Sequence, residues 1–292
     1  MIGRSDGKFA GGVLPLSADM QKNGARPLWL GYLSTSDVDG TLSAIVAEGG
    51  KIQMPATDLP NVGRIAMVAD PQGVPFYLMT PVPPPGVPDA TSDVFDRHAP
   101  QHVNWNELAS PDLAASKAFY SRRFGFEFNE SMDMGPMGDY CFIDHHGQRV
   151  GAVTQRQDER QPAVWLFYIG VPSIAAATRA IEANGGKVLM GPHEVPTGEW
   201  IVIATDPAGA GFGLTGPKGG EQTTIRPFRC GEERADTLRA FHTVEHRVQV
   251  GTRRVRRHRQ DSLLGRMIAE IAEGYFSVFD SAELVRGFGS PT

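Results

Sequence analysis

The sequence predicts an α+β fold built from repeated βαβββ units, and three observations lead to this prediction. The chain has 292 residues, 41% of them hydrophobic and 21% charged, which suits about two domains with buried cores. Residues 27–81 and 163–217 align without a gap at an offset of 136, with 18 identities in 55 positions. Between residues 99 and 217, strand-like and helix-like segments follow one order twice.

The repeat is incomplete in its first copy. Both copies contain Gly-Gly-Lys, at 49–51 and 185–187, and Asp-Pro, at 70–71 and 206–207. A weaker match at an offset of 140 relates residues 1–13 to 141–153. In this register the first copy lacks its opening strand and helix. We therefore expect a first copy truncated at its N-terminal side, with an apolar sheet edge left exposed.

The second copy gives each element in turn. A strand is predicted at 102–108, followed by a helix that begins at Ser110-Pro111-Asp112 and ends at Gly125. The second unit opens with an apolar strand at 164–171 and an Ala-rich helix at 172–184, closed by Gly185-Gly186. The remaining strands are predicted at 126–130, 139–144, 148–154, 187–190, 199–205 and 211–214.

Composition divides the chain into four segments. We predict a truncated first domain at 1–81, a stiff Pro-rich linker at 82–98 and a complete domain at 99–217. Residues 1–217 hold 15 Lys and Arg against 23 Asp and Glu, whereas residues 218–292 hold 13 against 10. The last segment, 218–292, is therefore treated as a separate basic tail, which we expect to be partly helical.

Several classes of protein are excluded by what the sequence lacks. No apolar run reaches the roughly 18 residues that span a bilayer, and residues 1–7 do not resemble a secretory signal. Two cysteines, Cys141 and Cys230, cannot build a disulfide framework. We expect a cytoplasmic protein with no membrane partner.

The element order and a few residues resemble the vicinal oxygen chelate superfamily of glyoxalases, bleomycin-resistance proteins and extradiol dioxygenases. The marks are Asp112 followed by Phe119-Tyr120 and Phe124-Gly125, and an Asp-Pro-x-Gly turn at 206–209. The tandem arrangement over residues 1–217 is similar to the two-domain glyoxalase-like branch. The resemblance implies curved, partly open barrel-like sheets around a pocket. That pocket often holds a divalent metal, bound by a His in the first strand and a Glu in the last strand of a unit.

The resemblance also implies where those ligands stand, and the residues there differ. The first-strand positions fall at Trp105 and at or next to Leu166, and the last-strand positions at Gly213 and Tyr77. None of these side chains is a strong metal ligand. We therefore predict a protein without the usual metal site and without a cofactor.

Strand alternation identifies candidate pocket residues. Trp105 and Glu107 share one face, whereas Leu108 takes the helix-facing side. A carboxylate inside such a sheet tends to have a raised pKa, which suits a general base, so Glu107 is the catalytic candidate. The alternative, that Glu107 is simply paired by a neighbour, stays open. Further candidates for ligand binding are Tyr140, Tyr168, His193 and Trp200, although strand aromatics are often only core residues.

Three functions are compatible with these features. The first is a protein that binds a small, partly apolar ligand in the 99–217 domain, or a lyase or isomerase using Glu107. The second is a metal-dependent enzyme resembling lactoylglutathione lyase or an extradiol dioxygenase, with displaced ligands such as Glu107 and His193. The third is an interaction protein acting through its tail. We also expect a dimer formed through the exposed edge of the first domain.

The tail contains two further patterns. His242-Thr243-Val244-Glu245-His246 matches the inverted zinc-protease motif, but too few residues follow it for such an enzyme. Residues 247–259 hold six Arg and no acid, which we interpret as a solvated basic stretch rather than a nucleic-acid site. Residues 262–278 have the apolar spacing of a helix.

Overall fold

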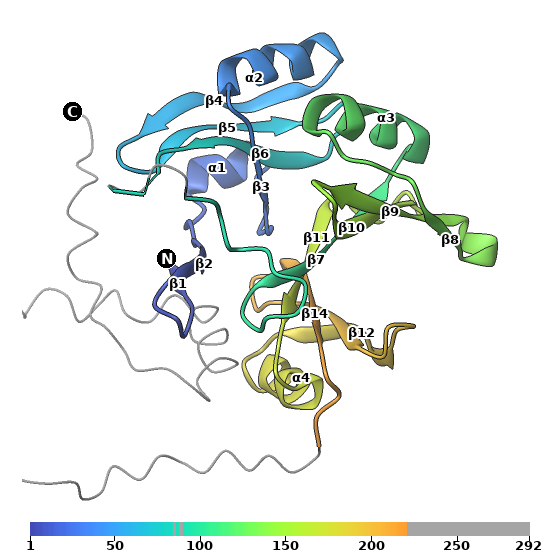
Figure 1. The fold of residues 1–292 in the computed structure, drawn as a ribbon. Helices are drawn as coiled ribbons and strands as arrows, with labels where there is room; N and C mark the ends of the chain where they lie inside the picture. Colours follow the sequence, from blue (N-terminus) through green and yellow to red (C-terminus); the bar gives the residue numbers. More distant parts are fainter. Residues whose placement is uncertain (84–85, 88–89, 221–292) are drawn as a thin grey trace, which may run out of the picture.

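The computed structural model describes residues 1–83, 86–87 and 90–220 and shows an α+β protein whose described strands form three open sheets (Figure 1). The predicted fold class of βαβββ units in sheets that do not close into a barrel is confirmed. The predictions for the tail beyond residue 220 lie outside the described residues. So do the inverted zinc-protease motif, the Arg-rich stretch and the predicted helix.

The largest sheet has eight strands and contains both units of the complete copy. Its strand order is β12-β13-β14-β11-β7-β10-β9-β8. The first strands of the two units, β7 and β11, pair antiparallel in the middle, so each unit forms one half of the sheet. The first unit is β7 (Val103–Ser110), α3 (Leu113–Phe124), β8 (Ser131–Asp133), β9 (Asp139–His145) and β10 (Gln148–Gln155). The second is β11 (Trp165–Gly170), α4 (Ile174–Ala183), β12 (Lys187–Glu194), β13 (Trp200–Thr205) and β14 (Gly211–Gly216).

The first copy contributes a four-stranded sheet that repeats the second unit. It consists of β3 (Tyr32–Ser34), α2 (Val38–Ala47), β4 (Lys51–Leu59), β5 (Gly63–Ala69) and β6 (Pro75–Pro81). Its order, β3-β6-β5-β4, matches β11-β14-β13-β12. Helices α2 and α4 begin and end at residues that are 136 apart, so the repeat found in the sequence is also a repeat of structure.

Local signals set the helix ends as the sequence predicts. The side chains of Asp37, Asp112 and Ser173 each accept a hydrogen bond from the backbone N–H three residues later, at the start of α2, α3 and α4. Helix α3 ends at Gly125, whose φ of 67° is a left-handed conformation that favours glycine.

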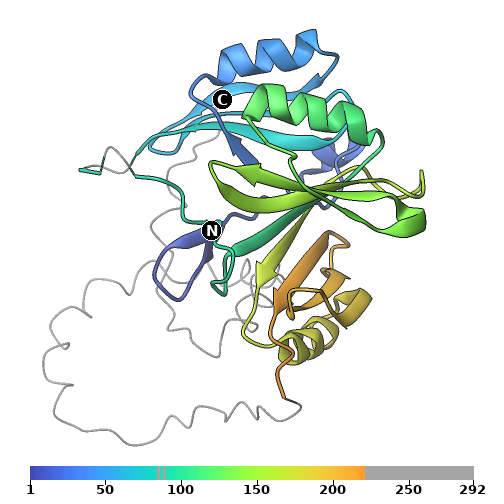
Figure 2. The ribbon, with the colours of Figure 1, turned by 45° about the vertical axis from the view of Figure 1, so that its right-hand side comes forward.

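The first-copy sheet and the first unit of the complete copy share one hydrophobic core. Helices α2 and α3 lie side by side in both views (Figures 1 and 2). At the centre, the buried hydroxyl of Tyr120 donates to Asp70 Oδ2 at 2.9 Å and accepts from Trp165 Nε1 at 3.1 Å. The polar groups of Asp70, Tyr120 and Trp165, which come from separate segments, therefore have partners inside the core. Arg122 and Arg123 pair with Glu48 across the same contact.

One predicted strand is displaced. Residues 126–130 do not form a full strand; Glu127 makes an isolated bridge to Asp144, and the strand of this unit, β8, begins at Ser131. The reason is that Phe126 is 9% exposed and stacks on Tyr120 at 5.9 Å, so the segment serves the core before it reaches the sheet.

The N-terminal residues form a hairpin away from the four-stranded sheet. Strands β1 (Ile2–Gly3) and β2 (Phe9–Gly11) pair antiparallel around Gly7, whose φ is 82°. The offset of 140 relates this hairpin to β9 and β10, which turn at Gly147 with a φ of 74°. A short helix that the sequence did not predict, α1 (Ala18–Lys22), follows it.

The sheet of the first copy has an open edge. Strand β3 is outermost, and within the described part of the chain no strand pairs with its free side. Tyr32 on this strand is 54% exposed and stacks on Tyr77 with ring centroids 4.7 Å apart. No described helix has the length and apolar character needed to cross a membrane. The boundaries of the four predicted segments stay predictions.

Candidate functional site: a half-buried carboxylate among aromatic side chains

Four predicted site residues come together on one face of the eight-stranded sheet. The pairing of β7 with β11 places Trp105 opposite Tyr168 and Glu107 opposite Leu166. Strand β10 lies between β7 and β9, with Ala152 beside both Glu107 and Phe142. Because Ala152 is small, the longer side chains on either side can meet above it.

Hydrogen bonds connect these residues in a chain. Trp105 Nε1 donates to the hydroxyl oxygen of Tyr140 at 2.9 Å. The Tyr140 hydroxyl in turn donates to Glu107 Oε2 at 2.7 Å. Phe142 packs edge-on against both aromatic rings, at 6.2 Å from Trp105 and 5.7 Å from Tyr140. Glu107 is therefore the last acceptor in a hydrogen-bonded chain that runs from Trp105 through Tyr140, and aromatic rings surround it. We call these three residues the Glu107 relay.

Burial controls the protonation of this group. Loss of water raises the pKa of Glu107 above its usual range, and the hydroxyls of Tyr140 and Tyr168 partly oppose this by stabilising the carboxylate. The pKa values of Tyr140 and Tyr168 are also raised, first by burial and then by the Glu107 charge. The two tyrosines consequently keep their protons, and Glu107 is the member of the group that gains and loses one.

The position of the expected last-strand metal ligand is filled by a ring. Gly213 on β14 pairs with Tyr168 on β11. A Cβ atom at residue 213 would lie 2.4 Å from the Tyr168 ring, which real Cβ atoms essentially never do. A glutamate at 213 would displace Tyr168. With Trp105 and Leu166 at the first-strand positions, this donor set does not fit a divalent metal of the family type.

Two other predicted residues are not part of this group. Trp200 lies on the helix-facing side of β13, packed against the core of Val202 and Ala204, with the Lys218 ammonium 4.4 Å from its ring. His193 lies on the edge strand β12 opposite Ile201. The described residues show no metal-ligating group that joins His193 to Glu107.

Sequence reasoning missed an arginine that lies over the site. Arg97 comes from the predicted linker, and its guanidinium stands 4.9 Å from the centre of the Trp105 ring. Its Nη1 donates to Glu199 Oε2 at 3.2 Å. A cation stacked on an indole is a favourable contact. The sequence does not indicate this role, because Arg97 lies in the Pro-rich linker and belongs to no motif.

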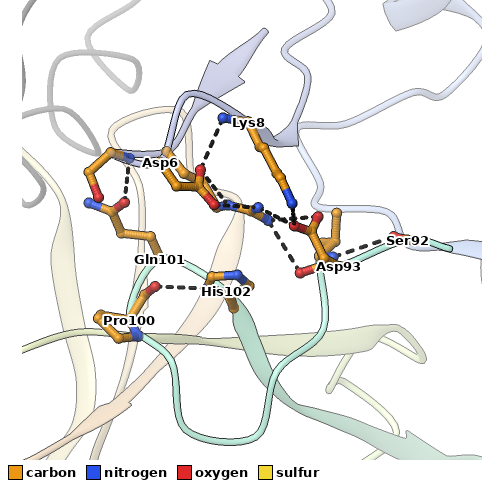
Figure 3. Close-up of polar contacts among 10 residues, drawn as sticks. Asp6, Lys8, Ser92, Asp93, Pro100, Gln101 and His102 are labelled. Atoms are coloured by element: carbon orange, nitrogen blue, oxygen red, sulfur yellow. Dashed lines mark hydrogen bonds and ion pairs between the residues drawn. The ribbon is translucent and has the colours of Figure 1, made fainter. Parts of the chain in front are cut away.

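A separate cluster of acidic residues lies near the N-terminal hairpin (Figure 3). Ligand atoms of Asp6, Asp93 and His102 lie within 4.8 Å of one another, the one such group among the described residues. Arg4, 1% exposed, already donates to Asp6 at 2.8 Å and to Asp93 at 2.7 Å, and Lys8 pairs with Asp93. The Arg4 guanidinium holds the pKa values of both carboxyls below their usual range. The cluster fastens the hairpin to the linker, and a metal there would have to displace a buried cation.

Comparison with known proteins gives a consistent set of relatives. Residues 100–214 match the model of the glyoxalase/bleomycin resistance protein/dioxygenase superfamily. CFP32 of Mycobacterium tuberculosis, a protein provisionally named a glyoxylase, is 29% identical over 203 residues, covering 66% of this chain and 71% of its own. The anthracycline biosynthesis protein DnrV of Streptomyces peucetius is 33% identical over 132 residues, covering 40% and 48%. The Mn(II)-bound glyoxalase of Novosphingobium aromaticivorans is a structural neighbour with a TM-score of 0.42 and 19% identity, covering 63% and 61%.

The raised pKa of Glu107 makes stability depend on pH. Above about pH 4 the unfolded chain gives up this proton while the folded chain keeps it. The contribution of Glu107 to the free energy of unfolding should therefore fall as pH rises, until its folded-state pKa is passed. Glu107→Gln removes this titration, so its stability relative to wild type should increase over the same window. The gain is about 1.4 kcal/mol for each tenfold difference in proton affinity.

Urea unfolding at a series of pH values measures this difference. Glu182→Gln, on an exposed residue of α4, is the matched control for the loss of one carboxylate. A Glu107→Gln curve that runs parallel to the Glu182→Gln curve at all pH values would show that Glu107 is not perturbed.

Proposed function

We propose that the domain at 99–217 binds a small, partly apolar molecule against Trp105 and Glu107 without a resident metal ion. Residues 100–214 of this domain belong to the glyoxalase/bleomycin resistance protein/dioxygenase superfamily. The observation that carries the proposal is the Tyr168 ring lying over Gly213. It fills the place of the ligand side chain and brings a hydroxyl toward Glu107 instead.

The same geometry supports proton transfer by Glu107. A general base is most effective when its pKa lies near the working pH, and burial shifts Glu107 in that direction. In a lyase or isomerase reaction, the Glu107 carboxylate would take a proton from a carbon next to a carbonyl group. It would return that proton to the product. Tyr140, held by Trp105, would orient the carboxylate.

The relatives support a small molecule as the ligand. CFP32 bears a provisional glyoxylase name, and DnrV is named for anthracycline biosynthesis. The aromatic walls formed by Trp105, Tyr140 and Phe142 suit a flat ligand that is largely apolar. Glu107 suits a hydroxyl or an acidic C–H on that ligand. The cytoplasm stays the expected compartment because the chain carries only two cysteines.

A hydroxylated anthraquinone tests this proposal directly. We expect 1,8-dihydroxyanthraquinone to quench tryptophan fluorescence saturably, equally well with and without EDTA. At a pH above the folded-state pKa of Glu107, where the group is a carboxylate, Glu107→Gln should weaken binding by about tenfold or more, since a hydrogen bond to a charged group contributes about 1.5–3 kcal/mol. Trp200→Phe, outside the aromatic face, is the matched control and should bind like wild type.

Two results would contradict the proposal. One is binding that appears only after a divalent metal is added. The other is a Glu107→Gln variant whose affinity equals that of the wild type.

We also propose that the open edge of β3 pairs with a second copy of the chain. The backbone N–H of Thr35 and the carbonyl of Gly31 bond to β6, so in this parallel pair the alternate residues Tyr32 and Ser34 direct theirs outward. The equivalent edge of β11 carries β7 in antiparallel pairing. A symmetric β3–β3 contact would reproduce that arrangement.

Light scattering of the wild type is expected to give a dimer. Ser34→Pro removes one outward N–H and spares the ladder to β6, so it should yield a folded monomer. Ser34→Thr keeps the N–H and should remain dimeric, with circular dichroism confirming the fold of all three. A monomeric wild type would refute this edge as an interface.

A further inference from the structure

A cavity of about 370 Å³ lies at the end of the eight-stranded sheet where β7 begins and β11 and β14 end. Its wall has polar side chains and apolar surface. The polar side chains are those of His98, Asn104, Thr197, Glu199 and Thr215, and the apolar surface comes from Pro100, Val171 and Pro172. Glu107 and Tyr140 do not line it. The cavity is therefore separate from the Glu107 carboxylate described above.

A β-bulge turns Asn104 toward this cavity. Tyr168 pairs with Trp105 and Ile169 pairs with Val103, so Asn104 has no partner residue on β11. Its side chain is buried, and Nδ2 donates to the carbonyls of Asp96 and Ala99. Two carbonyl acceptors fix which end of the amide is nitrogen.

The opposite end of that amide is an acceptor without a donor. Asn104 Oδ1 lies against Gly170, where an added Cβ would be 2.0 Å away, so only glycine fits there. Among the described residues no donor bonds to Oδ1. The oxygen is thus held in place at the cavity wall with its hydrogen-bonding capacity unused.

Thr215 presents a second unused group. The residue is 4% exposed and lines the cavity. Its carbonyl accepts from the Val171 N–H at 2.8 Å, but its hydroxyl bonds to no group in the described part of the chain. Trp29 Nε1 is the one fully buried side-chain polar atom that lacks a partner among the described residues, so the Thr215 hydroxyl is open to the cavity and can bond to a molecule that enters it.

Glu199 completes the polar wall at the cavity mouth. Its Oε2 accepts hydrogen bonds from Arg97 Nη1 at 3.2 Å and from the Thr197 hydroxyl at 3.4 Å. The Glu199 side chain is 27% exposed. No described donor bonds to Oε1. Arg97 bonds to Oε2 alone, and its guanidinium also lies over the Trp105 ring.

We propose that this cavity binds the protonated amino group of a small alkylamine. An ammonium group has three N–H donors, and the cavity offers the carboxylate Oε1, the amide Oδ1 and the Thr215 hydroxyl oxygen as acceptors. The proline and valine walls take a short alkyl chain. This site goes beyond the proposed function because none of its polar groups belongs to the Glu107 relay.

n-Butylammonium is the probe, with butyrate as the charge-reversed control of the same length, each titrated into the full-length chain and followed by backbone NMR. Saturable shifts of the Gly170 and Gly216 amides are expected with n-butylammonium and not with butyrate. Thr215→Val keeps the shape and deletes the hydroxyl, and it should weaken binding about fivefold to tenfold. Thr178→Val, whose hydroxyl bonds to the Ile174 carbonyl at 2.8 Å within α4, is the matched control and should bind like wild type.

Urea unfolding gives an independent reading of the same variants. Because the Thr215 hydroxyl is unpaired in the free protein, Thr215→Val should unfold at the same or a higher urea concentration than the wild type. Three results would overturn the proposal. They are equal binding of butyrate, an unchanged affinity in Thr215→Val, and the lack of any saturable shift with n-butylammonium.

Discussion

The antiparallel pairing of β7 with β11 is the interaction on which the rest of the structure depends. It joins two βαβββ units through their first strands and so makes one eight-stranded sheet from two halves. The same register places Trp105 opposite Tyr168 and Glu107 opposite Leu166, which gathers the candidate site. Its single irregularity, the bulge at Asn104, lies at the wall of the cavity at the sheet end.

In this site, a tyrosine ring lies where the family resemblance implies a metal-ligating carboxylate. Where the family resemblance implies a carboxylate on the last strand, this chain has Gly213, and the Tyr168 ring lies in the space that the glycine leaves. A half-buried carboxylate on the first strand, Glu107, is then stabilised by hydroxyls rather than by a cation. Hydroxyl donors stabilise a carboxylate less than a metal ion does, so burial dominates and Glu107 holds its proton more tightly. Such a group suits proton transfer or hydrogen bonding to a ligand.

Much of the fold could be predicted because its signals are local or repeated. The 136-residue offset fixed corresponding ends for α2 and α4, and capping residues such as Asp112 marked where helices start. Strand alternation placed Trp105 and Glu107 on one face of β7, because that strand has polar and apolar positions that distinguish its faces. Tyr140 and Tyr168 were candidates as aromatic residues on other strands. Trp200 was misplaced because β13 reads Trp-Ile-Val-Ile-Ala-Thr, and a strand that is apolar at nearly every position does not reveal its faces. Asn104 and Arg97 were missed because a bulge and a contact made by a linker leave no periodic trace.

The metal content of the protein distinguishes a hydrogen-bonded Glu107 from a metal-binding one. The full-length chain would be incubated with Mn²⁺, Ni²⁺, Zn²⁺ and Fe²⁺ in turn, passed through a desalting column and measured by elemental analysis. We expect no metal to be retained in stoichiometric amount, because Trp105, Leu166 and Gly213 offer no ligand set. One metal ion per chain that is lost in Glu107→Gln would contradict it. That result would show that Glu107 binds a metal ion and is not the proton-holding end of a hydrogen-bonded relay.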